Sequence, residues 1–295
     1  MENTQDWHQL AISLADLQVS DREIARIVRK GKSTVNDYLR SYREMKAQAR
    51  VDEMCCEPGR VEATEDNKDN SRILVISDMH IPYNHPKMLP FLAGLKLRYD
   101  PTRVICIGDE LDKHALSFHD SDPDLMSAGD ELRKSLPIIQ EVYQMFPDMD
   151  ILDSNHGSLV WRKAKHHGIP RHYIKSYNDV LGVGEGWKWH MDLTVTLPET
   201  ATTPEQKVYF HHGKAADGLK LSQAMGMSVV QGHYHEKFSV DYWANPLGAY
   251  FSMQVGCLIH DRSYAFSYNN TNLKRPIIGC GLIIDGVPVL ELMPL

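Results

Sequence analysis

The sequence has 295 residues, of which 42% are hydrophobic and 24% charged, and its formal net charge is −7. This composition is ordinary for a globular protein and excludes a wholly disordered, collagenous or coiled-coil chain. No apolar run approaches the roughly 18 residues that span a membrane, and the polar start lacks the plan of a signal peptide. Five cysteines are too few for a disulfide scaffold. We therefore expect a cytoplasmic protein without a membrane partner. The net negative charge excludes a globally basic surface for nucleic acid, but it allows a local basic patch.

Charge divides the sequence into three parts. Residues 20–50 carry nine Lys or Arg against four acids, which gives +5. Residues 52–70 carry seven acids against two cations and almost no large apolar residue, so they cannot offset the entropy cost of ordering. From residue 72 onward, short apolar runs alternate with helical patterns, as in an α/β domain. We expect an N-terminal domain over residues 1–50, an acidic linker over 51–71 and an α/β domain over 72–295.

The first domain is predicted to be all-α, with three short helices. Leu10, Leu14 and Leu17 recur at helical spacing. Ser20 to Glu23 has the pattern of a capping box, in which the Ser20 side chain accepts from the Glu23 amide. A connection of about four residues that contains glycine then leads to the third helix, which is the plan of a helix-turn-helix.

The last helix of a helix-turn-helix enters the major groove of DNA by its N-terminal end. The outward residues available for DNA contact there are Lys32, Ser33, Thr34, Asn36 and Arg40. Asn36 can pair with adenine, and Lys32 and Arg40 can meet phosphates. The segment 21–42 resembles bacterial and phage helix-turn-helix modules of the resolvase and sigma-factor type, which implies DNA as a partner and binding as a homodimer. The alternative is a helical cap or a dimerisation element with a solvated basic face.

The α/β domain contains five apolar runs that each end in potential metal ligands. The runs are residues 73–76, 104–107, 151–152, 208–210 and 229–230. The side chains that follow them are Asp78 and His80, Asp109 and Asp112, Asn155 and His156, His211 and His212, and His233 and His235. Ligands gather outside the carboxyl ends of strands in α/β sheets, so we expect these side chains to meet. Carboxylates, imidazoles and an amide oxygen suit Mn²⁺, Fe or Zn²⁺, and a carboxylate can bridge two ions about 3.5–4 Å apart.

The order of these motifs resembles the calcineurin-like metallophosphoesterase superfamily over roughly residues 72–260. The matching motifs are Asp78-x-His80, Gly108-Asp109-x-x-Asp112, Asn155-His156, His212-Gly213 and Gly232-His233-x-His235. The resemblance implies an α/β fold in which a two-sheet sandwich is flanked by helices, with a two-metal site at the strand ends. It implies one metal held by Asp78, His80 and His235, a second held by Asn155, His212 and His233, and Asp109 as the bridge. We expect two divalent metal ions as cofactors, with Mn²⁺ preferred over Fe, Zn²⁺, Ni²⁺ or Mg²⁺.

The resemblance also implies roles in catalysis. His156 would contact the phosphate and protonate the leaving oxygen, Asp112 would orient a ligand or water, and a metal-bridging hydroxide would be the nucleophile. The sequence departs from the family pattern at Gly157, where an acid usually follows the catalytic histidine. We prefer His212 over His211 as the metal ligand because it precedes Gly213. His211 is then a phosphate contact or a core residue.

The choice of substrate rests on the cations after His156, which include Arg162. These side chains can hold a second phosphate or a nucleic-acid backbone, or they form a solvated helix face. We expect hydrolysis of phosphate esters on a nucleic-acid substrate, by a nuclease or a DNA phosphatase. One alternative is a nucleotide or protein phosphatase. The other is a DNA-binding regulator with an inactive phosphoesterase domain, for which Gly157 is the support.

Overall fold

The computed structural model describes residues 7–16, 19–40, 42–43, 68–118, 124–260 and 275–294. The chain forms two compact units, Met1–Glu57 and Pro58–Leu295. Most of the predicted linker, residues 51–67, lies outside the described residues. Its last residues pack on the second unit, because the Nζ atom of Lys68 lies 3.0 Å from Oδ2 of Asp150 and Asn70 donates to the Thr196 carbonyl.

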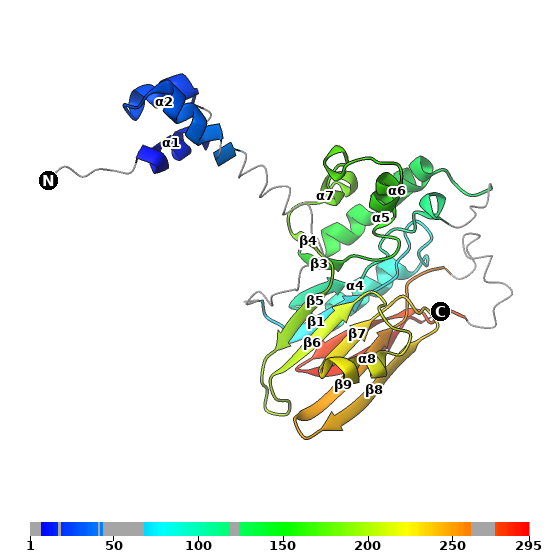
Figure 1. The fold of residues 1–295 in the computed structure, drawn as a ribbon. Helices are drawn as coiled ribbons and strands as arrows, with labels where there is room; N and C mark the ends of the chain where they lie inside the picture. The colour runs from blue at the N-terminus through cyan, green and yellow to red at the C-terminus, as the bar shows by residue number, and fades with distance from the viewer. Residues whose placement is uncertain are drawn as a thin grey trace. The chain divides into compact units, whose positions relative to one another are not determined.

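The first unit contains the three predicted helices: α1 (Trp7–Asp16), α2 (Asp21–Ile27) and a third helical segment over residues 32–40. They bury a small core of Ala11, Ile24, Ala25, Val28, Val35 and Leu39 (Figure 1). The predicted capping box is wrong, because Ser20 occupies the N-cap of α2 but its side chain makes no capping hydrogen bond. The Ser20 carbonyl instead accepts from the amides of Glu23 and Ile24, so the backbone alone closes the first turn.

The second unit is built on two β-sheets. The first sheet has the order β11-β10-β1-β2-β3-β4 and the second has the order β5-β6-β7-β9-β8. The strands of the first sheet are β1 (Arg72–Ile76), β2 (Arg103–Cys106), β3 (Met149–Leu152), β4 (Trp187–His190), β10 (Gly279–Ile284) and β11 (Val287–Leu292). Those of the second are β5 (Leu193–Leu197), β6 (Gln206–His211), β7 (Ser228–Gln231), β8 (Phe238–Asn245) and β9 (Gly248–Val255).

The ligand-bearing strands run parallel within each sheet. β1 pairs parallel with β2, β2 with β3 and β3 with β4. β6 pairs parallel with β7, and β7 with β9. Antiparallel strands β10 and β11 extend the first sheet, while β5 and β8 form the edges of the second. Each of the five apolar runs lies largely within one of the parallel strands. The carboxyl ends of β1, β2 and β3 therefore lie together at one edge of the first sheet, and those of β6 and β7 lie together at one edge of the second.

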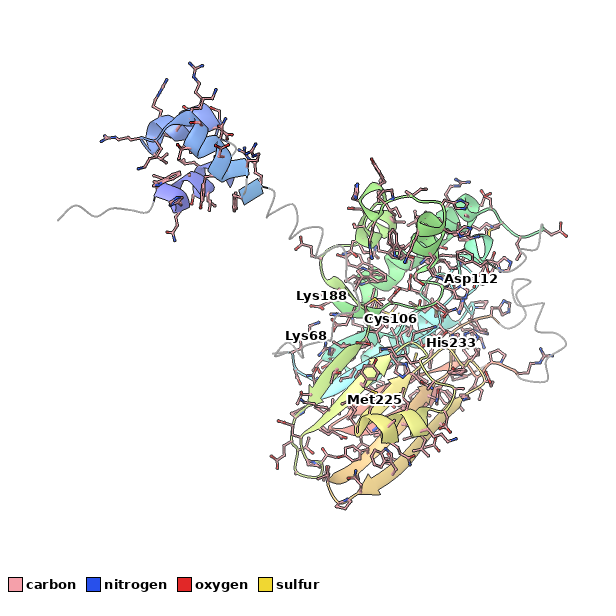
Figure 2. The ribbon with its side chains drawn as sticks, in the orientation of Figure 1. Lys68, Cys106, Asp112, Lys188, Met225 and His233 are labelled. Atoms are coloured by element: carbon pink, nitrogen blue, oxygen red, sulfur yellow. The ribbon has the colours of Figure 1, made fainter. Side chains whose placement is uncertain are left out.

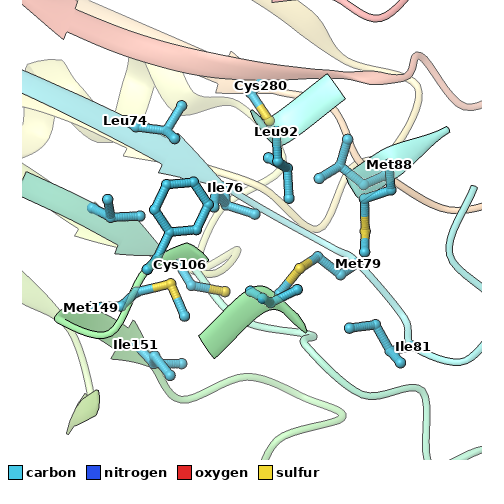
Figure 3. Packing of buried hydrophobic residues seen from close by; sticks show 14 of the residues in the cluster. Leu74, Ile76, Met79, Ile81, Met88, Leu92, Cys106, Met149, Ile151 and Cys280 are labelled. Atoms are coloured by element: carbon cyan, nitrogen blue, oxygen red, sulfur yellow. The ribbon is translucent and has the colours of Figure 1, made fainter. Parts of the chain in front are cut away.

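Alternation along the strands places apolar side chains on both faces of the first sheet. Ile73 and Val75 of β1 face the second sheet and pack in a core with Phe210, Val230 and other side chains of both sheets. Leu74 and Ile76 face the opposite way, onto helices α4 (Met88–Tyr99) and α5 (Ala128–Met145). Figure 3 shows this second core, where Met88 and Leu92 of α4 meet Leu74 and Ile76. The two sheets therefore form a sandwich that is covered by helices.

The second unit contains five further short helices among its described residues. They are η1 (His114–Leu116), α6 (Leu159–His166), η2 (Arg171–Tyr173), α7 (Tyr177–Leu181) and α8 (Gly218–Met225). Helix α8 covers the outer face of the second sheet, where Gly218 packs against Ser252 and Gln254. The unit is thus a mixed α/β sandwich of two sheets with helices. Among the described residues, no helix has the length and apolar character needed to cross a membrane.

Candidate metal centre

The carboxyl ends of the parallel strands bring the predicted ligands together. The amide of His233, which follows β7, donates to Oδ2 of Asp78, which follows β1, over 2.9 Å. The Nδ1 atom of His212, which follows β6, lies 2.8 Å from the carbonyl oxygen of Ile107 at the end of β2. The two sheets therefore meet at this edge. Figure 2 shows Asp112 and His233 at this end of the sandwich, away from Lys68 and Lys188.

The first group of ligands is Asp78, His80 and His235. Their ligand atoms lie within 4.8 Å of one another, with His235 Nε2 at 3.0 Å and His80 Nε2 at 3.8 Å from Asp78 Oδ1. Asp78 and His80 are fully or almost fully buried. A buried carboxylate beside two imidazoles is a ligand set for a divalent transition metal.

The second group is Asp109, His212 and His233, again with ligand atoms within 4.8 Å. Asn155 joins it, because its Oδ1 lies 2.7 Å from Nε2 of His212. All four residues come from different strand ends. This set of a carboxylate, two imidazoles and an amide oxygen can hold a second divalent ion.

Asp109 lies between the two groups. Its Oδ2 is 3.5 Å from Nε2 of His80 in the first group and 3.2 Å from Nε2 of His212 in the second. Its Oδ1 accepts a hydrogen bond from the His156 amide over 3.1 Å. One carboxylate oxygen is therefore within reach of both groups, which is the arrangement that a bridging ligand requires.

Four residues of the candidate metal centre have backbone conformations that residues other than glycine rarely adopt. The φ angles of Asp78, His80, Asp109 and His233 are 50°, 46°, 53° and 66°. Backbone strain of this kind persists only where the surrounding structure enforces the conformation, and strained residues are concentrated at functional sites. Gly232 permits the close approach of β7 to β1, because a Cβ there would lie 2.5 Å from Oδ2 of Asp78.

His156 projects from the loop after β3 toward the same centre, with its ring centroid 4.7 Å from that of His80. Its Nδ1 donates to the backbone carbonyl of Asp112, and the Asp112 carboxylate lies 3.9 Å from the same nitrogen. The Asp112 carboxylate also lies 2.7 Å from Nδ1 of His80. Asp112 thus orients both imidazoles and supplies the acceptor that Gly157 cannot.

The charges of the carboxylates control the histidine pKa values. Burial lowers the pKa of His212, but the Asp109 carboxylate outweighs it and raises this pKa to about 9. Burial also lowers the pKa of His80, and the hydrogen bonds with Asp112 and Asp78 reverse the shift, so the pKa lies well above its usual value. His156 keeps a lowered pKa because of burial and the nearby charge of His80. Divalent cations therefore compete with protons for His80 and His212.

A buried ion pair that the sequence analysis did not identify supports the His156 loop. The Nζ atom of Lys113 donates to the carbonyl oxygens of His156 and Gly157, each at 3.2 Å, and lies 3.4 Å from Oε1 of Glu110. It also lies over the Tyr177 ring, whose hydroxyl donates to the Gly157 carbonyl. Glu110 and Lys113 are spaced three residues apart just after β2. A single pair of charged residues forms no periodic pattern, so the sequence contained no indication that Glu110 and Lys113 are buried.

The predicted substrate-binding residues occupy two different places. His211 is fully buried and lines a cavity of about 290 Å³ together with Asn155, His212 and His233. Burial lowers the pKa of His211 to about 3, so this imidazole is neutral at physiological pH. Arg162 is exposed on α6, with its guanidinium carbon 5.0 Å from the centroid of the Phe118 ring. His211 therefore lies at the centre, while Arg162 lies on the surface of the helix that follows the His156 loop.

The predicted DNA-contacting residues lie on the third helical segment of the first unit. Lys32, Ser33, Thr34 and Arg40 are exposed, whereas Asn36 is half-buried. Arg40 forms an ion pair with Asp37 over 3.3 Å, in which both side chains are 70% exposed. The exposed side chains form a polar and basic face opposite the small apolar core.

Comparisons with known proteins find solved structures at low sequence identity and low TM-score. Neither the protein-family models nor the curated proteins include a match to this sequence. A solved archaeal phosphodiesterase is 13% identical, with a TM-score of 0.41 over 75% of this chain and 99% of that one. Vacuolar protein sorting 29 from Cryptosporidium parvum is also 13% identical, with a TM-score of 0.38 over 77% of this chain and 98% of that one. Vps29 from Chaetomium thermophilum is 12% identical, with a TM-score of 0.32 over 72% and 79%. At these values the functional argument rests on the site itself.

Proposed function

We propose that the protein hydrolyses phosphate esters with two divalent metal ions. The observation that carries the proposal is the position of Asp109, whose Oδ2 is 3.5 Å from His80 Nε2 and 3.2 Å from His212 Nε2. When bound, two such ions polarise phosphoryl oxygens and lower the pKa of water, which favours displacement at phosphorus. The mixed oxygen and nitrogen ligands favour Mn²⁺, with Fe, Zn²⁺, Ni²⁺ and Mg²⁺ as alternatives.

His156 is the proposed proton donor to the leaving oxygen. Its Nδ1–H donates to the Asp112 carbonyl. When the imidazole is protonated, its Nε2–H is therefore the group that can donate to the substrate. The buried ammonium of Lys113 donates to the consecutive carbonyl oxygens of His156 and Gly157 and so fixes the backbone of this loop. The chain therefore holds the ring in one orientation before a substrate arrives, which lowers the cost of reaching the transition state.

The proposed substrate is a nucleic acid, which makes the protein a nuclease or a DNA phosphatase. The exposed polar and basic face of residues 32–40 supports this choice, because it matches the face that a helix-turn-helix offers to DNA. The protein would bind paired DNA half-sites through this unit as a homodimer.

Two alternatives make different predictions. A nucleotide or protein phosphatase would turn over its substrate equally well after the exposed face is altered in a Lys32→Ala/Arg40→Ala variant. A DNA-binding regulator with an inactive phosphoesterase domain would show no metal-dependent turnover. The contact between His156 and the Asp112 carbonyl disfavours the regulator, because it supplies an orienting acceptor despite Gly157.

The test is hydrolysis of para-nitrophenyl phosphate, bis-para-nitrophenyl phosphate and a DNA oligonucleotide, each with Mn²⁺ and after chelation. We expect metal-dependent cleavage of the diester and the oligonucleotide, which Asp109→Asn abolishes. Asp241→Asn is a matched control, because Asp241 is an exposed carboxylate on β8. Preference for the monoester would favour a phosphatase, and full activity of Asp109→Asn would contradict the proposed site.

A further inference from the structure

We infer that the surface formed by α6, η2 and the residues beside them binds the backbone of a single-stranded nucleic acid next to the metal centre. This α6–η2 surface consists of Arg162, Lys163, Lys165, Arg171 and Lys175 with the aromatic rings of Phe118, Trp161 and Tyr173. The inference rests on the proposed function, because it supplies the polymeric substrate with a second contact surface. It is separate from the predicted DNA-contacting face of residues 32–40.

The charged residues of the segment that contains α6 and η2 are all of one sign. Residues 155–178 contain five Lys or Arg and no Asp or Glu, in a chain whose net charge is −7. Within the part of the chain that the structure describes, none of these five cations forms an ion pair. Solvated helix faces commonly interleave both signs of charge. A segment whose charged residues are all cations instead attracts a polyanion, with an affinity that falls as salt rises.

The cations are held in place by aromatic rings. Lys163 Nζ lies 4.4 Å and the Arg162 guanidinium carbon 5.0 Å from the centroid of the Phe118 ring. The Arg171 guanidinium carbon lies 5.4 Å from the centroid of the Trp161 ring. A cation over a ring face keeps its full charge, whereas a carboxylate partner would neutralise it. These three cations are therefore ordered at the surface and remain able to bind phosphate oxygens.

Tyr173 adds a stacking group to this positive surface. It lies at the end of η2 with 76% of its surface exposed, and its ring is 4.9 Å from that of His172. Exposed aromatic rings beside cations bind single strands, because bases stack on the ring while the cations follow the backbone. Bases within a duplex are stacked on one another, so their faces cannot stack on the Tyr173 ring. Tyr173 therefore favours a single strand over a double helix.

The α6–η2 surface is joined to the metal centre by the short segment between His156 and α6. Helix α6 begins three residues after His156, and the Leu159 amide donates to the His156 carbonyl over 3.2 Å. Helices η1 and η2 both pack against α6. The residues that directly precede His156 in the chain, Asp153 to Asn155, line the 290 Å³ cavity beside the centre. A phosphodiester at the metals would thus have its neighbouring phosphates beside α6 and η2.

The experiment measures binding of a fluorescent oligothymidylate of about 15 nucleotides to the full chain by anisotropy, in chelator so that no cleavage occurs. The test variant is Arg162→Gln/Lys163→Gln/Arg171→Gln. The matched control is Lys134→Gln/Lys188→Gln/Lys207→Gln, which removes the same charge from exposed positions on α5, β4 and β6. Both are also made in the Lys32→Ala/Arg40→Ala background, so that binding by the first unit does not mask the effect.

We expect the test variant to lose at least about tenfold in affinity in both backgrounds, and the control to lose less than about twofold. The slope of log affinity against log salt should become shallower by about 2, because three phosphate contacts on a single strand are lost. Tyr173→Ala should weaken binding by at least about fivefold without changing that slope. Equal losses in the test and control variants would overturn the inference. Tighter binding of a duplex than of the single strand in the Lys32→Ala/Arg40→Ala background would also overturn it.

Hydrolysis of bis-para-nitrophenyl phosphate by the wild-type chain is measured in parallel, because it tests the proposed function alone. Specific binding without turnover would mean that the proposed function fails and the surface assignment holds. Turnover with equal affinity of the wild type and the test variant would mean that the surface assignment fails and the proposed function holds.

Discussion

The Nδ1 atom of His80 lies 2.7 Å from Oδ1 of Asp112, and the carbonyl oxygen of the same aspartate accepts from Nδ1 of His156. One residue therefore fixes the orientation of two imidazoles whose ring centroids lie 4.7 Å apart. Partners of this kind set the tautomer and raise the basicity of a ligating histidine. Asp112 acts through its side chain on His80 and through its backbone on His156, so the two contacts can be separated by mutation.

Asp112→Ala should lower the affinity for Mn²⁺ by about 10- to 100-fold, because His80 loses the carboxylate that orients it. The backbone contact with His156 remains, so activity should recover in part at saturating Mn²⁺. Isothermal titration with Mn²⁺ measures the first effect, and hydrolysis across a range of Mn²⁺ concentrations measures the second. The exposed Asp241→Ala is the control. An unchanged affinity in Asp112→Ala would refute the role given to this carboxylate.

Lys113→Met should lower kcat with little change in Mn²⁺ affinity, since the lysine contacts the His156 loop and no predicted metal ligand. The variant removes two hydrogen bonds to carbonyl oxygens and leaves Glu110 buried without its cation. Steady-state kinetics on bis-para-nitrophenyl phosphate and the melting temperature should be measured together. Lys113→Arg, which keeps the charge, should restore part of kcat. A normal kcat in a folded Lys113→Met protein would contradict the positioning role.

Gly157→Ala should reduce activity, because the backbone at this position is closely packed. A Cβ at residue 157 would lie 2.8 Å from Oγ of Ser154, and this hydroxyl accepts from the Asp109 amide over 3.0 Å. Overpacking of this kind typically costs about 1–3 kcal/mol of stability. Gly94→Ala is the control, because a Cβ there would have no heavy atom within 4 Å. Equal activity of Gly157→Ala and the wild type would show that the Ser154 hydroxyl moves without consequence.

The metal centre was more predictable from the sequence than the contacts that support it. Short apolar runs end in polar side chains because a buried strand must be apolar until it leaves the core, and this rule could place Asp78 and His235 at strand ends. Their grouping around one metal came from the resemblance to the metallophosphoesterase superfamily and not from this rule. The positioning role of Lys113 could not be predicted, because the carbonyl oxygens to which it donates belong to residues more than 40 positions away. The Ser20 capping box was wrong because a short motif does not fix the side-chain rotamer.

Asp150 provides a test of stability away from the metal centre. Its carboxylate lies 2.8 Å from the Arg103 guanidinium, 3.0 Å from Lys68 Nζ and 2.9 Å from His190 Nε2. Burial raises its pKa, but the contacts with His190, Arg103 and Lys68 outweigh burial and hold the pKa below its usual value. The stabilisation from the ionised carboxylate is therefore present above the unfolded-state pKa of about 3.9. It is lost as the pH falls through the lowered folded-state pKa.

Asp150→Asn should lower the free energy of unfolding by about 3 kcal/mol at pH 7, because it removes the carboxylate charge that pairs with the buried guanidinium of Arg103. The difference from the wild type should shrink as the pH falls below about 4. Urea unfolding at several pH values measures both effects. Asp148→Asn is the control, since its side chain is 67% exposed and surface ion pairs contribute less than about 1 kcal/mol. Equal losses at the two positions would mean that burial of Asp150 does not matter.

The most direct test of the two-metal account is a titration of metal-free protein with Mn²⁺ that follows bound metal and hydrolysis of bis-para-nitrophenyl phosphate together. We predict two bound ions per chain, with activity that rises as the second ion binds. Asp109→Asn should bind fewer ions and remain inactive, because its carboxylate is the only described group within 3.5 Å of both His80 and His212. Full activity in metal-free protein, or an active Asp109→Asn variant with normal metal content, would contradict the account.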